Sequence, residues 1–143
     1  MTTRFDFLAI AVIVNGVEIT GFSDGDDAIT AKRRNDAFTD KIGADGFMMI
    51  SASADKSGEV TLKLQQTSPS NAYLLDLFSQ QETVGGFFQP INILIADTYN
   101  QDKIMGSNGY IKSLGDVARG KEGNDQEWVI IVERYDLLLG ASI

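Results

Sequence analysis

The feature that most restricts the fold is a change of periodicity within residues 58–78. In GEVTLKLQQ (58–66), Val60, Leu62 and Leu64 alternate with polar residues, the period-2 pattern of a half-buried strand. Directly afterwards the apolar residues follow the spacing of one helical stripe, at Tyr73, Leu74, Leu77 and Phe78. The pattern predicts a strand followed by one helix over about residues 69–82.

The start of this helix is marked by TSPSN (67–71). Serine is favoured at N-cap positions because its hydroxyl accepts a hydrogen bond from a free backbone N–H. Proline is tolerated at the first helical position, where its missing N–H costs nothing. Ser68 is therefore predicted as the cap and Pro69 as the first helical residue, with Ser70 as a rival cap.

The remaining segments alternate between short apolar stretches and turn clusters. Short connections favour antiparallel pairing, so the chain is predicted to be mainly β, and its length suits one domain over residues 1–143. Asn15-Gly16 is a strong hairpin signal, and in GADG we expect Gly43 and Gly46 to hold backbone angles that strain other residues. Strands are predicted over about residues 5–14, 17–22, 28–34, 37–43, 47–53, 59–66, 90–97, 103–113 and 127–135.

Composition excludes most catalytic chemistry. The 143 residues include no histidine and no cysteine, which removes the commonest general base, the commonest zinc ligand and every thiolate site. The net charge of −8 argues against a protein that wraps nucleic acid or binds an anionic membrane. The apolar run near the N-terminus is far shorter than the roughly 20 residues of a membrane span. We expect no enzyme activity, no catalytic residue, no metal site and no cofactor.

Two motifs resemble ligand sites but fail in detail. GDVARGKE (115–122) nearly matches a phosphate-binding loop, yet Glu122 stands where a hydroxyl should hold magnesium. SDGDDAIT supplies Asp24, Asp26 and Asp27 but lacks the closing glutamate of a calcium loop. Both segments are interpreted as turns or solvated loops.

Three short segments are candidates for contacts between subunits, each with an ordinary alternative. Arg33 and Arg34 either form a solvated strand face or pair with an acidic neighbouring subunit. The adjacent aromatic residues Phe87 and Phe88 are either both core or split between core and an interface. The leucines of DLLLGASI either pack between molecules or belong to an ordinary last strand: Leu137, Leu138 and Leu139.

Four segments together resemble a known family. VIVNGVEITGFSDGDDAIT, NDAFTDKIGADG, SGEVTLKLQQTSPSN and the late EW resemble, in order and spacing, the tail tube proteins of long-tailed, mostly contractile bacteriophages. The resemblance covers about residues 5–132. It implies an antiparallel β-sandwich or half-barrel with one flanking helix, whose copies form hexameric rings that stack into a hollow channel for genome delivery.

The resemblance also implies partners and a location. The partners would be further copies of the chain and the tail sheath, baseplate and terminator proteins, with DNA passing through unbound and no membrane. The location would be the virion tail, assembled in the bacterial host cytoplasm. A tail terminator or baseplate hub protein of related fold is the main alternative, and a ligand-binding β-sandwich module is a weaker one.

In such a tube, the sheet from about Ala28 to Gln66 is expected to line the lumen. If Val60, Leu62 and Leu64 face the core, the intervening polar residues face the channel. Ser51 and Ser53 would join them if Ile50 and Ala52 point inward, and Glu59 could offset the one cation. The lumen candidates are Ser51, Ser53, Thr61, Lys63 and Gln65.

Overall fold

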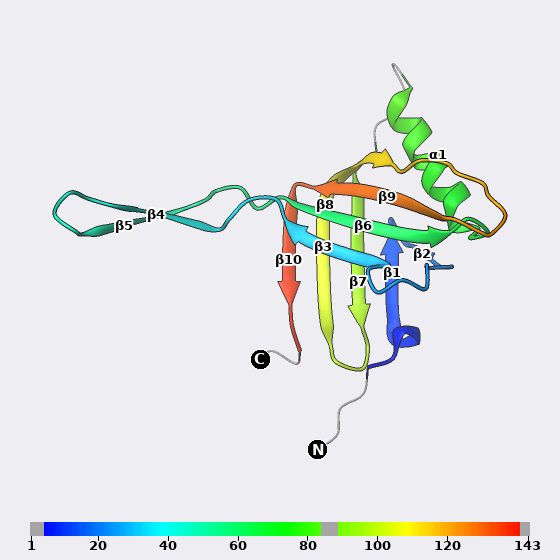
Figure 1. Ribbon diagram of the computed structural model, residues 1–143, viewed down its shortest axis with the longest axis horizontal. Helices are drawn as coiled ribbons and strands as arrows, with labels where there is room; N and C mark the ends of the chain where they lie inside the picture. Colours follow the sequence, from blue (N-terminus) through cyan, green and yellow to red (C-terminus); the bar gives the residue numbers. More distant parts are fainter. Residues whose placement is uncertain (1–4, 84–88, 141–143) are drawn as a thin grey trace.

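Figure 1 shows the computed structural model, which describes residues 5–83 and 89–140. The predicted mainly β fold with antiparallel pairing and one helix is confirmed. The elements are η1 Phe7–Ala9, β1 Ile10–Val14, β2 Val17–Ile19, β3 Ile29–Arg33, β4 Phe38–Ile42, β5 Met48–Ala52, β6 Gly58–Gln65, α1 Ser70–Glu82, β7 Ile91–Asp97, β8 Asp102–Leu114, β9 Asp125–Val132 and β10 Arg134–Leu138.

One long strand joins the two halves of the main sheet. The strand order is β2-β1-β7-β8-β9-β6-β3, and β10 also pairs with β8. The first part of β8 pairs with β7 and β10, and its last part pairs with β9. In Figure 1 the strands β10, β8, β7 and β1 cross the direction of β9, β6 and β3, so the sheet folds over on itself as a half-barrel.

Glycines allow β8 to pass close to its neighbours where it changes partners. A Cβ on Gly109 would lie 2.5 Å from the carbonyl oxygen of Ile131, and one on Gly106 would lie 2.6 Å from a methyl of Val132. Between them, Asn108 has a positive φ of 53°. The register also shifts between Ile111 and Ser113, and such irregularities are how a strand turns from one layer into another.

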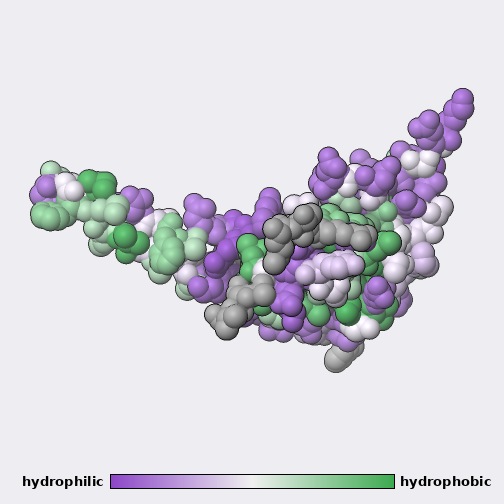
Figure 2. All heavy atoms as spheres, turned by 90° about the horizontal axis from the view of Figure 1, so that it is seen from below, coloured by the Kyte–Doolittle hydropathy of each residue, from purple (hydrophilic) through white to green (hydrophobic). Residues whose placement is uncertain are grey.

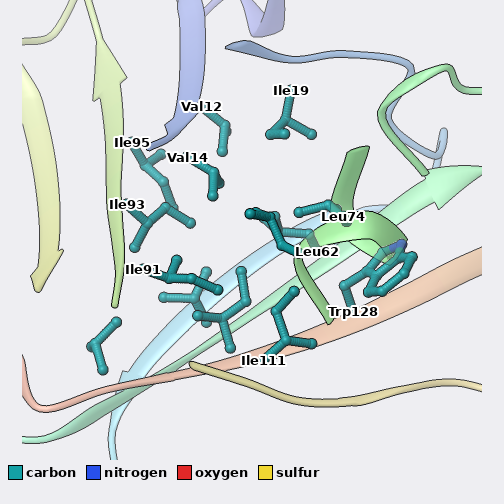
Figure 3. Close-up of a cluster of buried hydrophobic side chains, with 14 of the residues drawn as sticks. Val12, Val14, Ile19, Leu62, Leu74, Ile91, Ile93, Ile95, Ile111 and Trp128 are labelled. Atoms are coloured by element: carbon teal, nitrogen blue, oxygen red, sulfur yellow. The ribbon is translucent and has the colours of Figure 1, made fainter. Parts of the chain in front are cut away.

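The core lies inside the fold of the sheet and is closed by the helix. As predicted, Val60, Leu62 and Leu64 are fully buried. Leu74 and Leu77 of α1 pack onto the same cluster, where side chains from both halves of the sheet point toward one another (Figure 3). The buried residues of this cluster include Val12, Val14, Ile19, Ile91, Ile93, Ile95, Ile111, Trp128, Ile130 and Val132.

The helix begins one residue later than predicted. It starts at Ser70, with Pro69 at the cap position and no side-chain cap bond from Pro69 itself. The Ser68 hydroxyl still serves the helix start, because it accepts a hydrogen bond from the Ser70 N–H (3.2 Å) and donates one to the Thr20 carbonyl (2.5 Å). The segment therefore fastens α1 to the chain that follows β2.

Three predicted strand boundaries are wrong. The second strand ends at Ile19 instead of Phe22. The first strand begins at Ile10 instead of Phe5, because the Asp6 carboxylate accepts a hydrogen bond from the Leu8 N–H and caps a short 3-10 turn. The last predicted strand, residues 127–135, is two strands. It breaks at Glu133, where the chain passes from β9 to β10 along the same side of β8.

The hairpin turns agree only in part with the prediction. Asn15 and Gly16 both have positive φ, 50° and 85°, as a tight hairpin between β1 and β2 requires. Gly46 has a φ of 87°, as expected. Gly43 does not have a positive φ, so the expectation of a left-handed conformation there is wrong, and a Cβ at that position would approach the Asp45 carboxylate at 3.0 Å.

Candidate functional site

Strands β4 and β5 form a separate two-stranded hairpin that extends away from the body (Figure 1). We call residues 36–54 the arm. All ten residues of its two strands are exposed. The expected single sheet from Ala28 to Gln66 is therefore wrong, because β3 and β6 belong to the main sheet and β4 and β5 do not.

The arm has one apolar face on which none of the described residues outside the arm packs. Directly paired residues of antiparallel strands share a face, and Phe38 pairs with Ala52, Asp40 with Ile50 and Ile42 with Met48. The other face carries the pairs Thr39–Ser51 and Lys41–Met49. Figure 2 shows apolar residues gathered along the arm. Its exposed large apolar side chains are Phe38, Ile42, Phe47, Met48, Met49 and Ile50.

The arm divides the lumen candidates into two groups. Thr61, Lys63 and Gln65 lie on the face of β6 opposite the buried residues, as predicted. Ser51 and Ser53 belong to the arm instead, and Ile50, which was to point inward, is 61% exposed. The structure therefore does not bring the serines together with the β6 residues.

The lone cation of the β6 face has a different partner from the one expected. The Lys63 ammonium lies 2.7 Å from an Asp27 carboxylate oxygen, whereas Glu59 lies opposite Lys32. The hydrogen bond and charge of Lys63 lower the pKa of Asp27, and those of Asp27 raise the pKa of Lys63. The cation on this face is thus paired within its own chain.

Among the interface candidates, the structure brings Arg33 together with Leu137. Both line a hollow of about 410 Å³ beside β10, together with Lys56, Arg134, Tyr135 and Asp136. Leu137, Leu138 and Leu139 are all exposed, and Arg34 is exposed next to the arm. Phe87 and Phe88 lie outside the described residues.

The edges of the main sheet are not equally open. The Lys63 N–H donates to the Ala28 carbonyl and the Arg34 N–H to the Ser57 carbonyl, so alternate residues of β3 are bonded to β6. The backbone groups of the intervening Ile29, Ala31 and Arg33 therefore face the free side of β3. That edge offers a row of donors and acceptors to another strand.

The corresponding edge at the end of β8 is covered by the helix. The Gln81 side chain accepts a hydrogen bond from the Ile111 N–H (2.9 Å) and donates one to the Ile111 carbonyl (3.0 Å). The backbone N–H and carbonyl of Ile111 are therefore both hydrogen-bonded on the side of β8 that faces away from β9. Sequence reasoning missed this clamp, because it joins two residues that lie 30 positions apart in the chain.

The root of the arm is held by Asp55. Hydrogen bonds from Ser57, and then from Asn35, together with the nearby Arg34, lower the pKa of the Asp55 carboxyl from 3.8 to about 2. The Ser57 backbone N–H is 2.9 Å from this carboxylate. The carboxylate therefore ties β6 to the strand end that leads into the arm.

We expect this bond to make stability depend on acid. A carboxyl whose pKa is lowered by folding stabilises the folded state above its unfolded pKa, near pH 4, and loses that contribution as the pH falls toward 2. Denaturant unfolding between pH 5 and pH 2 should show a smaller loss in Asp55→Asn than in the wild type. Equal losses in the two proteins would contradict the role of Asp55.

Neither a metal-binding cluster nor a membrane-spanning helix is found in the part of the chain that the structure describes. Residues 5–83 and 89–140 contain no group of three or more Asp or Glu side chains placed to hold a metal ion. None of the described helices is long and apolar enough to cross a membrane. The features that do stand out are the apolar arm, the open edge of β3 and the hollow beside β10.

Comparison with known families gives these surfaces a context. The family model described as the bacteriophage PhiTE tail tube protein matches residues 3–140. The chain belongs to this family. As a tail tube protein it is a structural part of the phage tail and not an enzyme, which confirms the family and the function class expected from the sequence.

One curated relative is also a phage structural protein. Structural protein ORF10 of Pseudomonas phage KPP10 is 28% identical to this tail tube protein over 115 residues. The match covers 78% of this chain and 64% of the relative, so the chain spans less than two thirds of that protein.

Solved structures share the fold at low sequence identity. The sheath/tube terminator of the extracellular contractile injection system PVC, in the extended state, matches with a TM-score of 0.69 and 16% identity, over 96% of this chain and 98% of that one. The tube-terminating cap of the anti-feeding prophage AFP matches with a TM-score of 0.67 and 13% identity, over 98% and 94%. The PVC sheath-tube complex in the extended state matches with 0.67 and 16%, over 95% and 92%.

Proposed function

We propose that this tail tube protein, as a single domain, forms hexameric rings that stack into a hollow channel for genome delivery. The observation that carries the proposal is the apolar face of the arm, which no described part of the same chain covers. A lone two-stranded hairpin is marginally stable in water, so an exposed arm of this kind gains stability when another molecule packs on it. In a tube, that molecule is a neighbouring subunit.

The polar face of β6 suits the wall of the channel. Thr61, Lys63 and Gln65 stay hydrated and present no apolar surface, and the charge of Lys63 is offset by Asp27. Six copies of a chain with a net charge of −8 carry −48, so DNA meets no strong attraction in transit. The channel would guide DNA without binding it.

The proposed partners follow from the family and from neighbours of like fold. Further copies of the chain make the tube, while sheath, baseplate and terminator proteins contact its outside and ends. Assembly takes place in the cytoplasm of the bacterial host before the tail joins the virion. The terminator likeness also supports a second candidate, a protein that forms a single ring at the end of a tube.

Electron microscopy and solvent labelling test these assignments. The purified protein should form long tubes, whereas a terminator forms single rings and a ligand-binding module stays monomeric. A cysteine at Thr61 should react with a bulky maleimide in free subunits and be protected inside intact tubes. A cysteine at Asp76, on the exposed side of α1, serves as the control for labelling of the outer surface. Equal labelling of Thr61→Cys in both states would place the β6 face outside the lumen.

A further inference from the structure

Three neighbouring strands run between two ends of the body that differ in charge. Strands β3, β6 and β9 lie side by side, and each begins at one of these ends and stops at the other (Figure 1). The eight residues of β6 separate the ends by roughly 23 Å at about 3.3 Å per residue. The two ends are therefore distinct surfaces of one subunit.

The acidic end comprises Asp24, Asp26, Asp27 and Asp125. Asp24 and Asp125 line a hollow of about 280 Å³ whose other lining residues, Gln65, Gln66, Thr67, Gly123 and Asn124, carry no positive charge. Lys63 neutralises Asp27. The nearby loop of residues 115–124 contributes Arg119 and Lys121 but also Asp116 and Glu122, so its net charge is zero.

The basic end comprises Arg33, Arg34, Lys56 and Arg134. Arg33, Lys56 and Arg134 line the hollow of about 410 Å³ next to β10, where Asp136 is the one acidic lining residue. Asp136 pairs with Arg134 at 3.0 Å, and Asp55 and Glu133 lie close by. Arg33 and Lys56 form no ion pair with the described residues, and the Arg33 Nε is buried without a hydrogen-bond partner there. This hollow has unused positive charge and unused donors.

We propose that the basic end of one subunit docks on the acidic end of the next copy, so that copies join head to tail. The residues that line the basic hollow carry three positive charges and the one negative charge of Asp136, so their net charge is +2. The residues that line the acidic hollow have a net charge of −2. Because the basic and the acidic hollow lie on different surfaces of the subunit, the contact between two copies is heterologous. Such a contact repeats from copy to copy, as a ring requires. Exposed Leu137 beside the basic hollow adds apolar surface to the contact.

This inference rests on the proposed function and identifies which surfaces meet. The charged pairs set orientation more than they set affinity, because like-charged ends repel and opposite ends attract. Two copies are thus discouraged from meeting through the same end. The apolar contacts of the arm would then add most of the binding free energy.

Charge reversal at each end provides the test. Lys56→Glu/Arg134→Glu makes the basic hollow negative, and Asp24→Lys/Asp125→Lys makes the acidic hollow positive. Asp24→Lys/Asp26→Lys is a second acidic-end variant that keeps the hydrogen bond from Ser23 to Asp125. Each variant alone should fail to form tubes at concentrations tenfold above those that suffice for the wild type. An equal mixture of Lys56→Glu/Arg134→Glu and Asp24→Lys/Asp125→Lys should assemble, because every contact then joins hollows of opposite charge.

The control is Arg119→Glu/Lys121→Glu, which changes net charge as much as Lys56→Glu/Arg134→Glu but changes neither set of lining residues. Circular dichroism melting establishes that each variant is folded, and electron microscopy and sedimentation score assembly. Normal tubes from either variant alone, a folded mixture that stays unassembled, or loss of tubes in the control would overturn the head-to-tail contact. In each of these cases wild-type tubes still support the proposed function. A wild type that never self-associates overturns both.

Discussion

Replacing Ile42 and Ile50 with serine is expected to prevent tube formation at the concentrations that suffice for the wild type, while leaving the body folded. Both side chains lie on the apolar face of the arm and are about three-fifths exposed in the single chain. Burying an isoleucine side chain is worth about 1.5–3 kcal/mol, so losing two raises the concentration needed for assembly by roughly 100-fold or more. Sedimentation velocity and electron microscopy over a concentration series measure this shift.

The opposite face of the arm supplies the matched control. Lys41 and Met49 form a cross-strand pair there, and Lys41→Ser/Met49→Ser shortens side chains in the same hairpin without touching the apolar face. This variant should assemble near the wild-type concentration. If both double variants assemble normally, the apolar face is not a contact surface. If both fail equally, the hairpin as a whole is needed and its two faces are not distinguished.

Of the substitutions proposed here, replacing Trp128 with alanine is expected to lower the free energy of unfolding most. Its side chain is 2% exposed within the core, and its indole N–H donates to the Asn71 side-chain oxygen at 3.0 Å. Asn71 in turn donates to the carbonyl of Gln65, so one tryptophan connects β9, α1 and the end of β6. Truncating a buried tryptophan costs about 3–5 kcal/mol, a large share of the total of about 5–15 kcal/mol.

Thermal and denaturant unfolding measure this loss. Trp128→Phe is the control, because it keeps most of the buried ring and loses the hydrogen bond, and its expected cost is smaller. A wild-type melting temperature in Trp128→Ala would contradict the central position of this residue in the core. A cost in Trp128→Phe equal to that in Trp128→Ala would mean that the bond to Asn71, and not the buried volume, carries the effect.

The body of the fold could be predicted because its signals are local. The alternation around Leu62 and the helical stripe around Leu74 each arise from residues close in sequence, and burial follows the predicted faces. Asn15-Gly16 is equally local, since its positive φ angles are tied to the residue types. The short turn before β1 was missed because the hydrogen bond that the Asp6 carboxylate accepts from the Leu8 N–H outweighed the apolar run.

The arm could not be predicted, since periodicity reveals which side chains share a face but not what covers that face. Strands β4 and β5 have the same pattern as strands of the body, and only the long-range pairing of β3 with β6 excludes them from the main sheet. The partner of Lys63 was missed for the same reason, because Asp27 reaches it from a turn 36 positions away. The apolar FMMI segment was the one available signal that this region differs from the other strands.

The bonds from Gln81 to Ile111 bear on when polymerisation begins. A strand edge that its own chain already satisfies cannot template the addition of a foreign strand, so newly folded monomers have one site fewer for disordered aggregation. If assembly opens this edge, displacing the Gln81 amide costs free energy that a contact between two free monomers does not recover, whereas the several contacts at a growing tube end offset that cost. We therefore expect a lag before spontaneous nucleation and rapid elongation from existing starting points. The number of tubes would then be set by the number of initiators and not by the supply of subunits.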